Sequence, residues 1–178
     1  MVFMDKSGLI LVGIVSSFMH EMGHVFAIKL RGYEVDNINL GCVSADMFLK
    51  YHNFNDIFII LLSGSMMNFL IAAVFKILNF YISHDIIRAI YCQNMCIGVL
   101  NLLPVAVLDG GCILLLMLSK KTDICNAYKI LNILSFLFAI PVFVFGIWIL
   151  RDSGYNFSLL MVGIYLILCI FFKENTFL

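Results

Sequence analysis

The chain has 178 residues, enough for one domain, and 63% of them are hydrophobic while only 12% are charged. Soluble domains contain about 45–50% apolar and about 25% charged residues, so a water-soluble globule is excluded, as are disordered, collagen-like and coiled-coil chains. Eleven basic residues balance eleven acidic ones, which leaves no basic field for nucleic acid. The composition predicts a polytopic membrane protein embedded in a lipid bilayer.

Long apolar stretches predict the transmembrane helices. A spanning helix needs about 20 apolar residues, within a range of about 17–25. Five stretches approach or exceed that length: 8–30, 57–82, 86–118, 130–150 and 156–172. We therefore expect an all-α fold of about five transmembrane helices.

The first stretch ends in His20-Glu21-Met22-Gly23-His24, an HExxH motif. On a helix, residues four apart lie on the same face, so both imidazoles can reach one metal ion. Glu21 stands beside them and can accept a proton from water. Zinc suits these ligands and lowers the pKa of bound water to about 7, and a catalytic zinc site takes three protein ligands and keeps one open position. The sequence must supply a third ligand.

The segment 31–54 differs from the spans around it. Apolar residues between 35 and 43 are spaced among polar ones, and Gly32 and Gly41 stand at turn or bulge positions. This pattern predicts short strands at the membrane face instead of another helix.

The third stretch is too long for one helix. Its 33 residues would extend about 50 Å, against a bilayer core of about 30 Å. Pro104 lacks a backbone donor and disfavours helix at Leu103. We therefore expect a broken helix, unwound over roughly 101–108. Non-helical backbone at membrane depth is tolerated only where it is buried in protein or lines a wet cavity, so the break predicts a site.

Asp109 is the candidate third ligand. It is the one acidic residue of the third stretch, and a carboxylate at membrane depth is costly unless it is paired or bound to metal. His20 lies nine residues before Lys29, and Asp109 lies eleven before Lys120. These separations place them about 13 and about 16 Å from the same membrane border.

The distribution of basic residues predicts the orientation. Five crossings place three of them on one side of the membrane and seven on the other, and the richer side is expected to be cytoplasmic. The richer side holds Lys29, Arg31, Lys50, Lys120, Lys121, Lys129 and Lys173. The metal site is expected to lie toward this side.

The HEMGH sequence lies in a predicted membrane helix. It is followed by Asn101-Leu102-Leu103-Pro104 and by Leu108-Asp109-Gly110-Gly111. Together these motifs resemble the site-2 protease family of intramembrane zinc metalloproteases. The resemblance implies one zinc ion per chain, held by His20, His24 and Asp109.

The same resemblance implies roles for three other positions. Glu21 would be the catalytic base, and Asn101 and Pro104 would lie in the unwound segment that helps hold the substrate strand. The residues from Gly64 to Asn68 resemble the Gly-x-x-x-Asn element of the family. The implied activity is hydrolysis of a peptide bond in a membrane-associated protein.

Within that family the chain is most similar to the sporulation-type branch, which processes a membrane-associated sigma-factor precursor. The shared features are NLLP and LDGG followed by a leucine-rich run. We expect one intramembrane metalloprotease domain over 1–178, with no CBS or PDZ domain. The resemblance also leaves room for an inhibitory membrane partner.

Two alternatives remain open at this stage. A non-proteolytic membrane zinc protein, either a carrier or a sensor, could use the same ligands. The clustering of polar residues toward one membrane face argues against a carrier, which needs a polar relay through the bilayer. A scaffold that has lost catalysis is the other alternative, and the intact HExxH motif and Asp109 argue against it.

Overall fold

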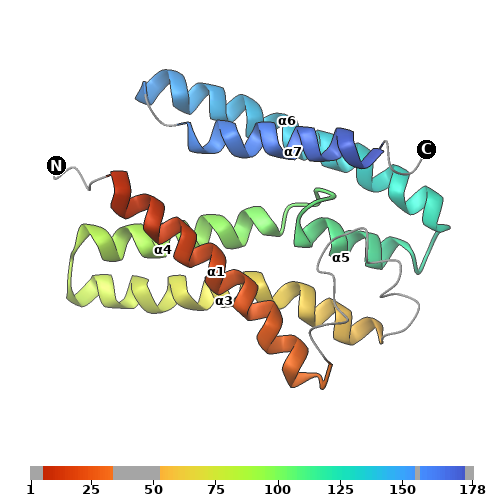
Figure 1. Ribbon diagram of the computed structural model, residues 1–178, viewed down its shortest axis with the longest axis horizontal. Coiled ribbons are helices and arrows are strands. Elements are labelled where there is room, and N and C mark those ends of the chain that lie inside the picture. Colours follow the sequence, from red (N-terminus) through yellow and green to blue (C-terminus); the bar gives the residue numbers. More distant parts are fainter. Residues whose placement is uncertain (1–5, 34–52, 155–156, 175–178) are drawn as a thin grey trace. The chain divides into compact units, whose positions relative to one another are not determined.

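The computed structural model describes residues 6–33, 53–154 and 157–174. These ranges form six α-helices and contain no strand, which confirms the all-α prediction for this part of the chain (Figure 1). The predicted strand-like segment 35–43 lies outside the described residues. The helices are α1 (Lys6–Leu30), α3 (Phe54–Tyr81), α4 (Asp85–Asn101), α5 (Asp109–Leu118), α6 (Ile124–Ser153) and α7 (Ser158–Glu174).

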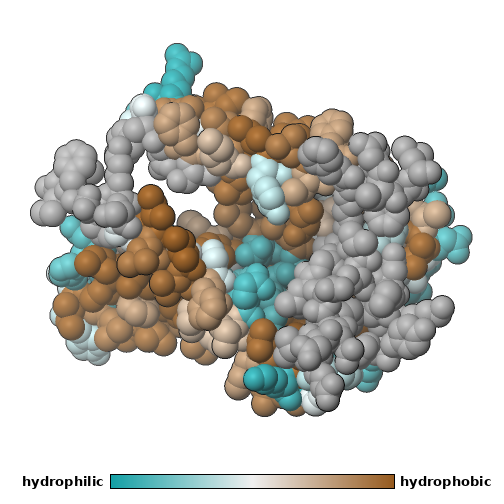
Figure 2. All heavy atoms as spheres, in the orientation of Figure 1, coloured by the Kyte–Doolittle hydropathy of each residue, from teal (hydrophilic) through white to brown (hydrophobic). Residues whose placement is uncertain are grey.

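Among the described residues, three helices are long and apolar enough to cross a bilayer: Ile10–Leu30, Phe54–Tyr81 and Ile124–Ser153. Only 17% of the most apolar part of α6 is buried inside the protein. Large hydrophobic side chains such as Leu137 and Phe145 are exposed on this helix, and brown apolar atoms cover much of the visible surface in Figure 2. Lipid is the environment that suits such a surface.

The third predicted stretch is divided as expected, with one correction to its boundary. The helix α4 ends at Asn101 and α5 begins at Asp109, so the unwound part covers 102–108, not 101–108. The Asn101 amide donates to the Ile97 carbonyl one turn earlier, at 3.2 Å. Pro104 restricts only the residue before it, Leu103, so the helix can continue to Asn101.

Other parts of the chain satisfy the unwound backbone. The Ala106 N–H donates to Ser135 Oγ of α6 at 2.8 Å, and that hydroxyl donates in turn to the Leu131 carbonyl at 2.7 Å. Gly111 of α5 packs directly against this segment, because a Cβ there would overlap the Val105 carbonyl oxygen. Val105 and Ala106 are buried, and the N–H groups of Val105, Ala106 and Leu108 have acceptors. Membrane depth permits non-helical backbone only where it is buried in protein or lines a wet cavity.

The chain forms two compact units, which divide between Leu102 and Leu103. In the first unit, α3 and α4 lie antiparallel and α1 crosses them (Figure 1). In the second unit, α6 and α7 form an antiparallel pair and α5 packs on α6. Val105 contributes to a core with Ala139, Leu166 and Ile170, so the unwound segment belongs to the packing of the second unit.

Ion pairing fixes the ends of α1 and α3 in the first unit. Arg31 Nη1 lies 2.8 Å from Asp56 Oδ1, and the Tyr33 hydroxyl donates to Asp56 Oδ2 at 3.0 Å. This hydrogen bond to the carboxylate raises the pKa of Tyr33 above its ordinary value. Below these contacts, Ala27, Ile28 and Ile60 form a small buried core. These contacts therefore hold α1 against α3 near the HExxH motif.

The crossing itself depends on Gly23. A Cβ at this position would lie 2.8 Å from the Ser63 carbonyl oxygen and 3.1 Å from Gly64 Cα, so the two helix backbones nearly touch. We expect Gly23→Ala to force the helices apart and to lower the free energy of unfolding by about 1–3 kcal/mol. The thermal unfolding midpoint of the detergent-purified protein measures this change.

Gly13→Ala is the matched control on the same helix. Its Cβ would have only Gln93 Oε1 nearby, at an ordinary contact distance of 3.9 Å. Since alanine stabilises a helix interior by about 0.5–1 kcal/mol relative to glycine, this variant should hold or raise the midpoint. Equal midpoints for the two variants would contradict the close-contact explanation.

Candidate metal centre

The two histidines of the HExxH motif lie together on the buried face of α1. His20 is 5% exposed and His24 is 3% exposed, and their Nε2 atoms are 3.3 Å apart. The rings meet edge to face, with centroids 4.9 Å apart. The two side chains therefore meet on one face of α1, as two ligands of one metal ion would have to do.

This spacing fits a zinc site. With Zn–N bonds of about 2.0–2.1 Å and tetrahedral angles, two nitrogen ligands lie about 3.3 Å apart. The two imidazoles therefore need little movement to bind one ion. Buried imidazoles in an apolar helix also lack water as a partner, which makes such a pair costly without a function.

The helix α3 determines which nitrogen of His24 is available. His24 Nδ1 lies 2.8 Å from the Ile60 carbonyl oxygen, and a carbonyl only accepts, so Nδ1 carries the proton. The Nε2 atom of the neutral ring then keeps its lone pair for a metal. An outer partner of this kind is a regular feature of histidines that bind metal ions.

Gly64 of α3 lies directly against both rings. A Cβ at this position would overlap His24 Nε2 and would lie 2.8 Å from His20 Cε1. No residue other than glycine leaves room for the imidazoles here. The absence of a side chain at this point of α3 is therefore a condition for the arrangement of the two histidines.

Asn68, one turn further along α3, contacts His20, the first histidine of the motif. The side chain is fully buried, and its Nδ2 lies 3.1 Å from His20 Nδ1. Ile60, Gly64 and Asn68 thus meet the two histidines at successive four-residue steps of α3. The sequence pointed to Gly64 and Asn68 only by resemblance. It gave no sign of the Ile60 contact, because every residue has a backbone carbonyl.

Asp109, the predicted third ligand, is the first residue of α5 and is half-buried. The N-terminus of a helix carries partial positive charge, which stabilises a carboxylate at this position. Asp109 belongs to the second compact unit, whereas the histidines belong to the first.

The other predicted site residues lie on the same elements. Glu21 is exposed on α1 beside His20. Asn101 is the last residue of α4 and Pro104 lies in the unwound segment, and both are half-buried.

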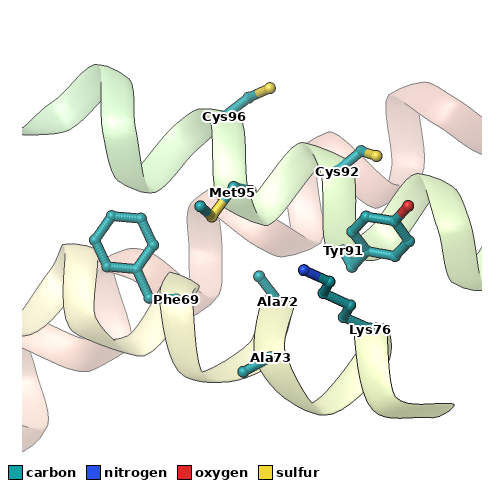
Figure 3. Close-up of a pocket in the computed structure, with 8 residues that line it drawn as sticks. All are labelled: Phe69, Ala72, Ala73, Lys76, Tyr91, Cys92, Met95 and Cys96. Atoms are coloured by element: carbon teal, nitrogen blue, oxygen red, sulfur yellow. The ribbon is translucent and has the colours of Figure 1, made fainter. Parts of the chain in front are cut away.

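A separate cavity lies between α3 and α4, away from the histidines. It has a volume of about 470 Å³ and is lined by Phe69, Lys76, Tyr91 and Cys92, among others. Figure 3 shows Lys76 reaching from α3 across toward α4, while the thiols of Cys92 and Cys96 point outward from α4. Both cysteines are free and exposed. A lysine near a helix end that extends along an apolar surface is ordinary snorkelling.

The chain is similar to proteins that are already known. No protein-family model matches the chain. A zinc metalloprotease of Methanocaldococcus jannaschii is 25% identical over 166 residues, an alignment that covers 88% of this chain and 46% of that protein. This chain therefore spans about half the length of that relative. The solved structure of a site-2 protease from the same organism matches with a TM-score of 0.65, at 22% identity, over 90% of this chain and 74% of that one. The structural match shows a shared fold.

The contact of Gly64 with the imidazoles generates a prediction. We expect Gly64→Ala to displace both rings and to weaken zinc binding by at least about tenfold, as disruption of outer contacts does at other zinc sites. Competition with a chromophoric chelator on the purified protein measures the affinity.

Gly98→Ala is the control for helix packing. Its Cβ would come within 2.7 Å of the Phe69 ring between α3 and α4, but it would not contact a histidine. We expect this variant to retain wild-type zinc affinity. A similar loss in both variants would show that general packing, and not the contact with the rings, controls binding.

Proposed function

We propose that this chain is a zinc-dependent intramembrane metalloprotease of the site-2 protease type, acting on a membrane-associated protein. The observation that carries the proposal is the buried pair of imidazoles with Nε2 atoms 3.3 Å apart inside an apolar helix. The similarity to a zinc metalloprotease and the fold shared with a site-2 protease support the same activity.

One zinc ion per chain would be held by His20, His24 and Asp109. Two neutral imidazoles and one carboxylate form a recognised donor set for a catalytic zinc. The similar calculated depths of His20 and Asp109, about 13 and about 16 Å from one membrane border, support this set. The half-buried carboxylate at the start of α5 agrees with it.

Glu21 would be the general base. A bound zinc ion supplies Lewis acidity and lowers the pKa of a coordinated water to about 7. Glu21 follows the first histidine directly, and its exposed carboxylate can accept a proton from the attacking water and return it to the leaving amine. An exposed glutamate on an otherwise apolar helix needs such a role, since its charge is costly at membrane depth.

The unwound segment 102–108 would help to hold the substrate. A substrate helix hides its carbonyl groups, so it must become extended before it can be hydrolysed. Asn101 directly precedes this segment and Pro104 lies within it, and the Asn101 amide can exchange its bond to the Ile97 carbonyl for one to substrate backbone. The segment 35–43 could add an edge strand to the same extended chain by β-augmentation.

The chain is a multi-pass membrane protein, and we propose five crossings. The candidate spans in α1, α3 and α6 would account for three, α4 and α5 together for the broken one, and α7 for the last. The seven basic residues on one side against three on the other support a site that opens toward the cytoplasm. A sigma-factor precursor as substrate and an inhibitory membrane partner rest on the sequence resemblance alone.

The decisive comparison uses Glu21→Gln and Asp109→Ala. We expect Glu21→Gln to keep zinc and to lose at least about a hundredfold in peptide hydrolysis, because a general base contributes about 10²–10⁴-fold. Asp109→Ala should lose both zinc and activity, because it removes a ligand. Zinc content and cleavage of a membrane-anchored peptide by protein in proteoliposomes measure the two effects.

Each contrary outcome has a distinct meaning. Full cleavage by Glu21→Gln would reject the base. Zinc retained by Asp109→Ala would place the third ligand elsewhere. Zinc binding without cleavage by the wild type, tested on several membrane peptides, would favour a carrier or sensor.

Asn101→Ala tests the substrate contact. We expect this variant to cleave a membrane-anchored substrate less efficiently, because it loses a hydrogen bond that contributes about 1–2 kcal/mol. Its zinc content should be unchanged. The comparison of kcat and KM with the wild type measures it. Unchanged cleavage would remove Asn101 from the substrate site.

A further inference from the structure

Asn68 carries one of four buried side-chain atoms that have no hydrogen-bond partner in the described ranges. Its side chain is completely buried on α3, and within the described ranges its Oδ1 has no hydrogen-bond partner. Its Nδ2 faces His20 Nδ1 at 3.1 Å. A buried carbonyl oxygen without a partner costs roughly 1–3 kcal/mol, so this atom calls for a physical explanation.

The positions of the ring protons on the two histidines provide an explanation. His24 Nδ1 donates to the Ile60 carbonyl, so Nε2 of the neutral ring is an acceptor. His20 Nε2, 3.3 Å away, can then donate to it. His20 Nδ1 is left as an acceptor, and it faces the N–H of Asn68 Nδ2. In the protein without bound metal, each of these ring nitrogens therefore has a partner of the matching kind, a donor facing an acceptor.

A metal ion at the two Nε2 atoms changes this proton pattern. His20 Nε2 can bind a metal only with its lone pair, so the ring proton must lie on Nδ1. Nδ1 then donates, and the Asn68 Nδ2 group, which also donates, no longer suits it. A half-turn of the carboxamide exchanges the two atoms and brings Oδ1 to Nδ1–H.

We propose that Asn68 is the positioning residue of His20, whose amide oxygen accepts the Nδ1–H in the metal-bound protein and so fixes the tautomer and direction of the ring. The inference rests on the proposed zinc site. It assigns a role to the Oδ1 atom, which has no hydrogen-bond partner in the described ranges.

The carboxamide suits this position better than the alternatives. Leucine has a similar volume but cannot accept, so the Nδ1–H of a metal-bound His20 would be buried without a partner. Aspartate can accept with either oxygen, so it serves the metal-bound protein. Asparagine alone can donate to His20 before metal binds and accept afterwards, since its two ends differ.

The test is zinc affinity, measured on the purified full chain in nanodiscs by competition with a chromophoric chelator. We expect Asn68→Leu to weaken zinc binding by about 10–100-fold, the usual cost of losing an outer partner of a ligating histidine. Asn68→Asp should bind zinc at least as tightly as the wild type. If Asn68 merely filled space, leucine, which has a similar volume, would keep the zinc affinity as well.

Asn94→Leu is the matched control. Asn94 is 1% exposed in the same unit, but its amide donates to Ser16 Oγ at 2.9 Å and not to a histidine. We expect this variant to keep wild-type zinc affinity. Thermal unfolding of the metal-free proteins identifies variants that fail to fold. If Asn68→Leu fails to fold, Asn68→Ala replaces it, because alanine removes the acceptor without adding bulk.

The outcomes separate this inference from the proposed function. Wild-type affinity in Asn68→Leu, or an equal loss in Asn68→Asp, overturns the role of Asn68 while the zinc site stands. Absence of zinc binding by the wild type overturns both. Loss in Asn68→Leu with retention in Asn68→Asp and Asn94→Leu supports the role.

Discussion

The close approach of α1 to α3 is the constraint on which the candidate site depends. Gly23 and Gly64 lie at the crossing, and a Cβ on either would meet backbone or imidazole atoms of the other helix at less than 3 Å. Helices in a bilayer gain no hydrophobic energy from contact with each other, so close packing at small residues is a main source of their association. The same contact brings His24 to the Ile60 carbonyl. The close contact of the two helices therefore both stabilises their packing and orients the imidazoles of the candidate metal site.

Buried polar groups give the first unit its specificity. Ser16, His20 and His24 are spaced four residues apart on α1, and each is at most 5% exposed. Each also has a hydrogen-bonding neighbour on another helix: Asn94 for Ser16, Asn68 for His20, and the Ile60 carbonyl for His24. A rotation of α1 would leave these groups unpartnered in an apolar environment, where each is expensive. The polar residues thus select one arrangement among the many that apolar surfaces alone would allow.

The sequence predicted the helices well, and it pointed to the candidate site residues, because both leave a direct pattern. Apolar length gives the spans, the excess length of the third stretch with Pro104 gives the break, and the HExxH spacing gives the histidine pair. Boundaries were less certain: α6 covers Ile124–Ser153, whereas the apolar run suggested 130–150, since a helix can continue into polar residues beyond the bilayer core. The contacts that tune the site were not predictable. The Ile60 carbonyl and the Ser135 hydroxyl act through long-range packing, and nothing in their own residue types distinguishes them.

The supports of the two histidines follow the repeat of α3. The Ile60 carbonyl, Gly64 and Asn68 are successive members of one helical face, while neighbours such as Met66 and Leu70 are exposed on another. Each residue advances a helix by about 100°, so one residue inserted or deleted between positions 61 and 67 would carry Asn68 to a different face while leaving the composition almost unchanged. This stretch of the chain is consequently tolerant of substitution on its lipid-facing positions and intolerant of any change in length. Among relatives of this protein, the number of residues here should vary less than their identity.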